Sequence, residues 1–99
     1  MKITLLCALG MSTSLLVKKM KQVAERRGLN VTIEAHSVDD VDQQLSESDV
    51  ILLGPPIRYK KHELLKKAEV VGVPIDIIDM KAYGTANAEK VLDQALSLF

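Results

Sequence analysis

The sequence predicts an α/β fold: one four-stranded parallel sheet with helices on both faces, in a single domain spanning residues 1–99. Short strand-like runs alternate with segments of helical periodicity, which is typical of a βαβαβαβα chain. Two of the four strand-like runs are apolar at almost every position, as central strands are. The other two carry polar residues at alternate positions, as edge strands do. Together these patterns predict the strand order 2-1-3-4.

The first part of the chain contains two predicted strands and two predicted helices. Residues 2–7 form an apolar run and predict the first strand, and residues 30–36 alternate between apolar and polar side chains and predict the second. Between them, residues 13–27 have helical periodicity, and Gly28 follows as a helix stop. Ser37 can cap a short helix after the second strand. The apolar faces of these two helices carry Leu16, Met20, Val23 and Ala24, and Val38, Val41 and Leu45.

The third strand is predicted at residues 49–54, where the run that follows Asp49 is again continuously apolar. Pro55 and Pro56 forbid a helix until Ile57 or later. From there a helical pattern runs to Gly72. The stripe of this helix consists of Ile57, Lys61, Leu64, Leu65 and Ala68.

The last part of the chain contains the fourth strand and the last helix. Residues 74–79 alternate partially and predict a strand, and residues 80–85 are expected to be a connection. Asn87 can cap the final helix. The inward positions of that helix are Ala88, Val91, Leu92 and Ala95.

The composition excludes several classes of protein. Lys plus Arg and Asp plus Glu both number 13, so charge gives no indication of a nucleic-acid partner, and none is expected. The single cysteine cannot form an internal disulfide or a Cys-x-x-Cys motif. No apolar run approaches the roughly 20 residues of a membrane span, and the N-terminal run is too short for a signal peptide. We therefore expect a soluble, cytoplasmic chain, monomeric when alone.

The candidate site is the loop after the first strand. A parallel sheet of this order reverses its winding between strands 1 and 3, and such sheets bind ligands at that point, beyond the carboxyl ends of the strands. Cys7 ends the first strand there, and a glycine and three hydroxyl residues follow. Backbone N–H groups and the dipole at a helix N-terminus favour a thiolate and can hold a phosphate-sized anion. We therefore expect the pKa of the Cys7 thiol to lie below its ordinary value of about 8.5. We interpret the Cys7 thiolate as a nucleophile that accepts a phosphoryl group in this loop.

The residues alone leave other interpretations open. Cys7 can equally be a small core side chain, and the hydroxyl residues can simply cap the helix. Low-molecular-weight tyrosine phosphatases have Cys-x5-Arg in this loop, but here Thr13 stands at the position of the arginine. No Walker motif is present. His36 and His62 have neither metal-ligand spacing nor a carboxylate partner in the sequence, so no metal site and no cofactor are predicted.

Three stretches resemble a known family: CALGMSTSLLVKKM at 7–20, DVILLGPPIRY at 49–59 and IDMKAYG at 78–84. They are similar to the IIB component of bacterial sugar phosphotransferase systems, in the lactose/cellobiose/chitobiose group. The resemblance implies a fold like that of low-molecular-weight tyrosine phosphatases. It also implies a protein-phosphohistidine–sugar phosphotransferase in which Cys7 takes a phosphoryl group from a IIA protein. Cys7 then passes it to a β-glucoside, chitobiose or lactose type of sugar on the membrane component IIC.

The positions of residues after the first, third and fourth predicted strands suggest which others act. The phosphate-binding loop, here called the Cys7 loop, comprises Ala8, Leu9, Gly10, Met11, Ser12, Thr13 and Ser14. Candidates for the rim of the site or for partner docking are Pro55, Arg58, Tyr59, Lys60, Asp79 and Tyr83. Tyr59 is expected to pack near the site, and Asp79 to cap a turn or bond the loop. Tyr83 is expected to occupy a turn, with the rim of the site or a partner contact as the alternative. The basic segment 58–62 is expected to be a solvated face, or to attract an acidic or phosphorylated partner. The alternative functions are a cysteine-dependent phosphatase or thiol reductase on a similar fold, and a non-catalytic binding module.

Overall fold

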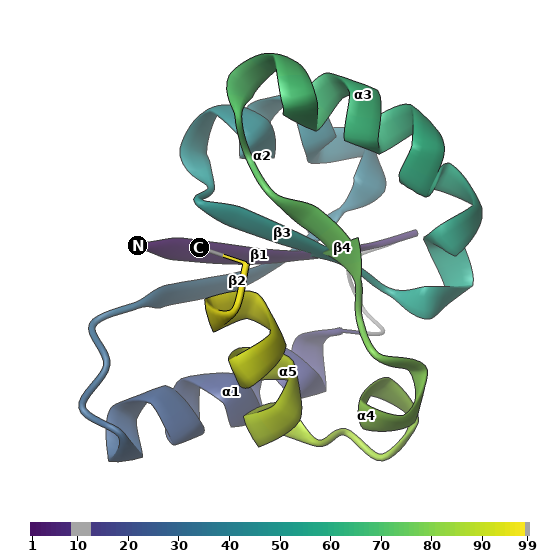
Figure 1. Ribbon diagram of the computed structural model, residues 1–99. Coiled ribbons are helices and arrows are strands. Elements are labelled where there is room, and N and C mark those ends of the chain that lie inside the picture. The colour runs from purple at the N-terminus through teal and green to yellow at the C-terminus, as the bar shows by residue number, and fades with distance from the viewer. Residues whose placement is uncertain (9–12, 99) are drawn as a thin grey trace.

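The strands of the protein lie in one parallel sheet with the order β2-β1-β3-β4 (Figure 1). This is a computed structural model, and it describes residues 1–8 and 13–98. The strands are β1 (Lys2–Cys7), β2 (Thr32–Ser37), β3 (Val50–Leu53) and β4 (Ile75–Ile77). The apolar runs β1 and β3 are central and the alternating runs are at the edges, so the predicted order is confirmed.

Helices cover both faces of the sheet, as predicted. On one face lie α1 (Ser14–Arg26), α4 (Met80–Gly84) and α5 (Ala88–Leu96), and on the other lie α2 (Val41–Glu47) and α3 (Lys61–Val71) (Figure 1). Two short 3-10 helices precede α2 and α3, namely η1 (Val38–Asp40) and η2 (Pro55–Lys60). The parallel strands all run in one direction, so β1, β3 and β4 deliver the segments that follow them to the same edge of the sheet.

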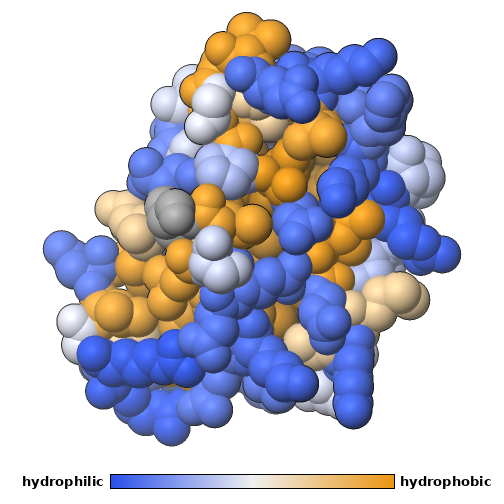
Figure 2. All heavy atoms as spheres, in the orientation of Figure 1, coloured by the Kyte–Doolittle hydropathy of each residue, from blue (hydrophilic) through white to orange (hydrophobic). Residues whose placement is uncertain are grey.

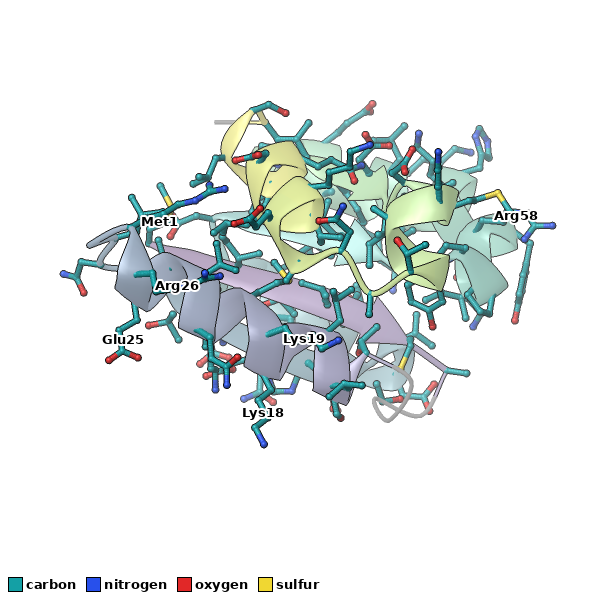
Figure 3. The ribbon with its side chains drawn as sticks, turned by 90° about the horizontal axis from the view of Figure 1, so that it is seen from below. Met1, Lys18, Lys19, Glu25, Arg26 and Arg58 are labelled. Atoms are coloured by element: carbon teal, nitrogen blue, oxygen red, sulfur yellow. The ribbon has the colours of Figure 1, made fainter. Side chains whose placement is uncertain are left out.

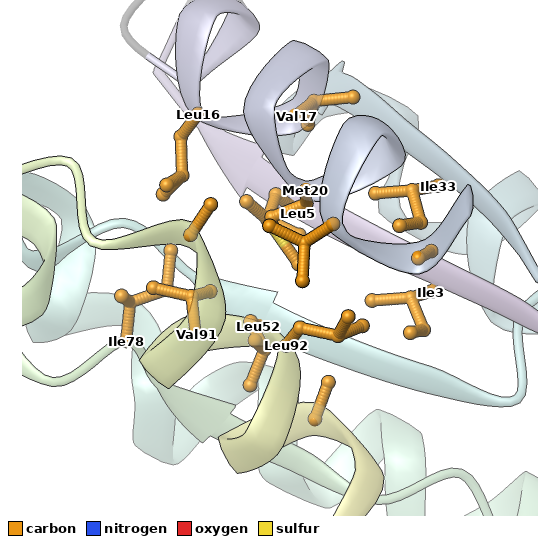
Figure 4. Packing of buried hydrophobic residues seen from close by; sticks show 14 of the residues in the cluster. Ile3, Leu5, Leu16, Val17, Met20, Ile33, Leu52, Ile78, Val91 and Leu92 are labelled. Carbon is orange, nitrogen blue, oxygen red and sulfur yellow. The ribbon is translucent and has the colours of Figure 1, made fainter. Parts of the chain in front are cut away.

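The core on the α1 and α5 side is aliphatic. Leu5 and Leu52 of the sheet face Met20 of α1 and Leu92 of α5, and all four side chains are excluded from solvent (Figure 4). Burying one such side chain stabilises the fold by about 1.5–3 kcal/mol. This packing anchors α1 and therefore fixes where its first residues meet the end of β1.

The core on the α2 and α3 side includes a buried polar group. Thr4 of β1 shares a 2.6 Å hydrogen bond with Ser48, and its hydroxyl also lies 3.4 Å from the Gln44 amide oxygen. Unpaired polar groups are costly in an apolar interior. Within the described residues, every buried side-chain nitrogen and oxygen has a partner.

The structure corrects three expectations about helices. Residues 80–85, expected to be a connection, form the helix α4 up to Gly84, because Asp79 caps its first turn by accepting a hydrogen bond from Ala82 N. A 3-10 turn begins at Pro55 itself, since a proline fits the first position of a helix. The α-helix α3 starts only at Lys61, because Ile57 has non-helical angles (φ −109°, ψ 19°) that interrupt the predicted stripe.

The surface alternates between polar helix exteriors and apolar seams. Figure 2 shows one face, where apolar atoms form a band between the polar outer surfaces of the helices. Within the described ranges, no helix combines the length and apolar character needed to cross a bilayer.

Candidate functional site

Cys7 lies buried at the end of β1, with only 2% of its surface exposed. Its Cα pairs in register with Ser37 of β2. On the β3 side, Gly54 N–H donates to Leu6 O at 2.8 Å, and a Cβ on Gly54 would stand 3.6 Å from the Cβ of Cys7. The sheet therefore holds the thiol firmly between two neighbouring chain segments, at the edge where the sequence predicts ligand binding.

Thr13 brings the start of α1 to the sulfur. Its side chain is fully buried, and its hydroxyl donates to Cys7 Sγ at 3.7 Å. It makes no side-chain hydrogen bond to the first turn of α1, so Thr13 is not the side-chain cap that one interpretation of the sequence suggested. A hydroxyl that donates to sulfur favours the thiolate over the thiol. The hydroxyl of the residue six positions after Cys7 thus faces the Cys7 sulfur.

Ser37, predicted from the sequence only as a helix cap, lies directly beside Cys7. Its Oγ donates to Ala8 O at 3.1 Å and accepts from Asp39 N at 3.2 Å, so it does cap η1 but also holds the first residue of the Cys7 loop. The signal that could have found it is the parallel register, since Ser37 ends β2 directly beside Cys7. Ala8 is exposed, and Ser14 is the exposed first residue of α1. Leu9, Gly10, Met11 and Ser12 lie outside the described residues.

The predicted rim residues after β3 differ in exposure. Pro55 is buried, Lys60 is half-buried, and Tyr59 is 74% exposed, so the expectation that Tyr59 packs against the protein is wrong. The guanidinium of Arg58 donates to Pro55 O at 3.1 Å. In Figure 3, Arg58 projects from the end of the molecule opposite Met1, whereas Lys18 and Lys19 project outward from α1.

The predicted rim residues after β4 belong to α4. Asp79 is exposed and caps this helix with its Oδ2, which is the capping role that the sequence analysis weighed. Tyr83 is partly buried and packs against the apolar core on the α1 side. Both residues follow β4 and therefore lie on the same edge of the sheet as Cys7.

The electrostatics near the end of β2 centre on Glu34. The His36 Nε2 lies 2.7 Å from Glu34 Oε1, which corrects the expectation that His36 has no carboxylate partner. Residues two apart in a strand share a face. The hydrogen bond with His36, and second the one with Lys2, lower the pKa of Glu34 from its ordinary 4.5. Among residues 1–8 and 13–98, no three His, Cys, Asp or Glu side chains come together as a metal ion would require.

The sequence is similar to a known protein family over almost its whole length. Residues 2–94 match the family described as "PTS system, Lactose/Cellobiose specific IIB subunit". The chain belongs to this IIB family. It is therefore a IIB component of a sugar phosphotransferase system, and the resemblance of its motifs is confirmed.

Curated relatives of this IIB chain cover almost its whole length. The galactose-specific EIIB component of Lactococcus lactis subsp. cremoris and the cellobiose-specific one of Lactococcus lactis subsp. lactis are each 46% identical over 97% of the chain and 94% of the relative. The oligo-beta-mannoside-specific EIIB component of Bacillus subtilis is 43% identical over 98% and 94%. Relatives of nearly equal identity thus carry names of different sugars.

Solved structures extend the comparison to the fold. The cellobiose-specific IIB component of Borrelia burgdorferi has a TM-score of 0.84 and 40% identity, covering 100% of this chain and 91% of that one. The lactose-specific IIB domain of Streptococcus pneumoniae has a TM-score of 0.87 and 22% identity over 100% and 97%. A YwlE mutant from Bacillus subtilis has a TM-score of 0.54 and 16% identity over 99% and 98%. The last two show the fold alone, and the predicted likeness of this IIB chain to the low-molecular-weight tyrosine phosphatase fold is confirmed.

Proposed function

We propose that Cys7 carries a phosphoryl group from a phosphohistidine of IIA to a sugar bound by the membrane component IIC. The observation that carries the proposal is the placement of Cys7 Sγ at the end of β1, 3.7 Å from the hydroxyl of Thr13 at the start of α1. A thiolate in contact with a helix N-terminus is both a nucleophile and the centre of an anion-binding site.

The proposed reaction has two displacements at phosphorus. In the first, the Cys7 thiolate attacks the phosphorus of phosphohistidine, the S–P bond forms, and the N–P bond breaks with its electron pair returning to the imidazole. In the second, a sugar hydroxyl oxygen attacks, the S–P bond breaks, and the thiolate is restored while the hydroxyl proton leaves to solvent or a base on the partner. Both steps need positioning and charge stabilisation more than covalent assistance from the protein.

The chemistry of Thr13 suits a carrier better than a hydrolase. A phosphatase of this loop type has a bidentate arginine at this position, and loss of such a contact lowers catalysis by about two to three powers of ten. Here the group that faces Sγ is a neutral hydroxyl. A neutral donor stabilises the phosphoryl group less strongly, which leaves it free to move to the next acceptor.

Exposed apolar side chains at the same edge support docking of IIA and IIC around Cys7. Leu15 in the first turn of α1, Tyr59 in η2 and Met80 at the start of α4 are 60%, 74% and 63% exposed. They follow β1, β3 and β4, so all three segments leave the sheet where Cys7 ends β1. Large exposed side chains that gather at one edge are typical of an interaction surface. Arg58 and Lys60 add positive charge there.

The sugar is proposed only as a class, namely a β-glucoside, chitobiose or lactose type of sugar. In the proposed cycle the sugar is held by IIC and not by this chain. The three curated relatives differ in their named sugar at 43–46% identity, so similarity of the IIB chain does not select one sugar.

Intact mass spectrometry tests the proposal. The protein is incubated with phosphoenolpyruvate, the general phosphotransferase proteins and the matching IIA. We expect the mass of one phosphoryl group, removed by iodine, which cleaves the S–P bond, and absent in Cys7→Ser. Transfer to sugar is then followed with membranes that contain IIC.

Two outcomes would support the alternatives instead. Steady hydrolysis of p-nitrophenyl phosphate that disappears in Cys7→Ser would indicate a phosphatase. No added phosphoryl group with several IIA proteins of this class, in a chain that is folded, would indicate a binding module in which Cys7 is a core residue.

A further inference from the structure

One edge of the sheet is formed by β4, which has a neighbouring strand on one side only (Figure 1). On that side, Ile78 N–H, directly after the strand, donates to Leu53 O of β3 at 2.9 Å. The N–H and C=O groups of an extended chain point alternately to its two sides, so Ile77 O and Asp79 N–H point away from β3. Such outward groups are a template on which another chain can pair.

The side-chain amide of Gln94, in α5, occupies the outer side of this strand end. Its Nε2 donates to Ile77 O at 2.7 Å, and its Oε1 accepts from Asp79 N–H at 2.9 Å. In a parallel pair of strands, one residue likewise bonds to the C=O of one residue and to the N–H two positions further along its neighbour. The amide of Gln94 therefore makes the two hydrogen bonds that a residue of a fifth strand would make.

Asp76 occupies the outward N–H of Ile77. That N–H donates to Asp76 Oδ1 at 2.8 Å, and Lys61 Nζ lies 3.3 Å from the same oxygen. Ile77 N–H, Ile77 O and Asp79 N–H are thus all bonded to side chains. Outside them lies a hollow of about 570 Å³, lined by Ile77, Asp79 and residues of α5. Side chains, and not a further strand, therefore close this edge.

We propose that Gln94 prevents β4 from pairing with the β4 strand of a second copy of this chain. Every copy carries the same edge, and a two-fold axis beside β4 would bring two such strands together in antiparallel orientation. The amide of Gln94 opposes this pairing because it already bonds the backbone groups that the second strand would need. This inference concerns self-association and does not depend on the function proposed for Cys7.

The test uses three substitutions of Gln94 and one control. Gln94→Ala frees the edge and keeps a residue that favours the helix α5, and Gln94→Met does so with a side chain of similar length. Gln94→Lys lacks the acceptor for Asp79 N–H but places a charge beside the edge, a device by which natural edge strands resist pairing. Asn87→Ala is the control for lost stability, because it removes the 3.2 Å bond from Lys90 N–H to Asn87 Oδ1 and leaves the edge closed.

The measurement is sedimentation equilibrium of each folded protein, from low micromolar to nearly millimolar concentration. We expect wild type, Asn87→Ala and Gln94→Lys to keep the mass of a monomer. The weight-average mass of Gln94→Ala and Gln94→Met should rise with concentration toward twice that mass. Hydrogen exchange at low concentration shows whether the edge has opened, and Asp79 N–H should exchange about threefold to tenfold faster in Gln94→Ala than in wild type.

Three results would overturn the inference. One is a folded Gln94→Ala whose Asp79 N–H exchanges faster but whose mass stays that of a monomer at every concentration. Another is an equal rise in mass for Asn87→Ala or Gln94→Lys, since lost stability would then be the cause and not the open edge. The third is a wild-type chain that itself associates through β4.

Discussion

Replacing Thr13 by valine removes the hydroxyl that faces Cys7 and keeps the shape of the side chain. Thr13 is fully buried, and its Oγ1 donates to Cys7 Sγ at 3.7 Å. A hydrogen bond to a charged acceptor is worth about 1.5–3 kcal/mol, against about 1 kcal/mol for a neutral one. The difference between the two cases means that the hydroxyl favours the thiolate over the thiol by roughly 1 kcal/mol at this long distance. A free energy of about 1.36 kcal/mol corresponds to a shift of one pKa unit.

The expected result is an upward shift of the pH at which Cys7 becomes reactive, by roughly half to one unit. The fold should persist, because the lost partner of Thr13 is sulfur, a weak acceptor. The bond from Val17 N–H to the Thr13 backbone carbonyl, 2.9 Å in the wild type, does not involve the hydroxyl and is expected to remain. We expect the free energy of unfolding to change by less than about 1 kcal/mol.

The assay is the rate of alkylation by iodoacetamide as a function of pH, since only the thiolate reacts. Thr32→Val is the control, because Thr32 is exposed and pairs with Lys2 at the other end of β1. A pH midpoint that is identical in wild type and Thr13→Val, with both proteins folded, would refute the idea that this hydroxyl acts on the sulfur.

Three further predictions concern the surface, the sheet edge and pH. Changing Arg58 and Lys60 to Gln should slow phosphoryl transfer from IIA at low salt and have a smaller effect at high salt, because 0.1 M salt screens exposed charges beyond about 10 Å. Equal transfer rates for the variant and the wild type at low salt would mean that the two side chains are merely solvated. Gln94→Ala removes the side-chain bonds to Ile77 O and from Asp79 N, and denaturant unfolding should show a loss of about 1–2 kcal/mol; an unchanged midpoint would contradict this. The lowered pKa of Glu34 means that its ionised form stabilises the fold above about pH 4.5, a contribution lost as the pH falls through the lowered value. Glu34→Gln should therefore show less loss of stability on acidification than wild type, and parallel curves would count against the contacts with His36 and Lys2.

The order of the strands was predictable because the burial of each strand determines the pattern of apolar residues within that strand. A central strand is covered on both faces, so β1 and β3 are apolar at most positions, whereas β2 and β4 alternate. The helix α4 has no comparable pattern of apolar residues in the sequence. It has five residues, its only fully buried side chain is Ala82, and it depends on one capping bond from Asp79. A helix of one turn held by a cap has no periodicity to detect.

The site was predictable only where it is local in the chain. Cys7 and Thr13 are six residues apart, and the known geometry of a strand, loop and helix brings them together. Ser37 and Ala8 are 29 residues apart, and their contact exists only because the parallel register places the ends of β1 and β2 side by side. The exposure of Tyr59 was missed for a different reason. Tyr59 lies in the 3-10 turn η2, which is interrupted at Ile57 and has no regular helical spacing from which the exposure of the tyrosine could be predicted.

The charge of the hydrogen-bond donors near the cysteine can explain how a phosphoryl carrier differs from a phosphatase of the same fold. Two hydroxyls donate hydrogen bonds at the end of β1, Thr13 to the sulfur of Cys7 and Ser37 to the backbone carbonyl of Ala8. Neutral donors hold a dianion through several moderate bonds, whereas an arginine holds it through a strong bidentate pair. Tight binding of the phosphoryl group lowers the energy of the phosphocysteine and so raises the barrier to its departure. Under the function proposed above, the chain gives its phosphoryl group to a second partner, and the neutral hydroxyl of Thr13 suits that task better than an arginine would. In the same proposal the positive charge of Arg58 lies outside the site, where it can attract a partner.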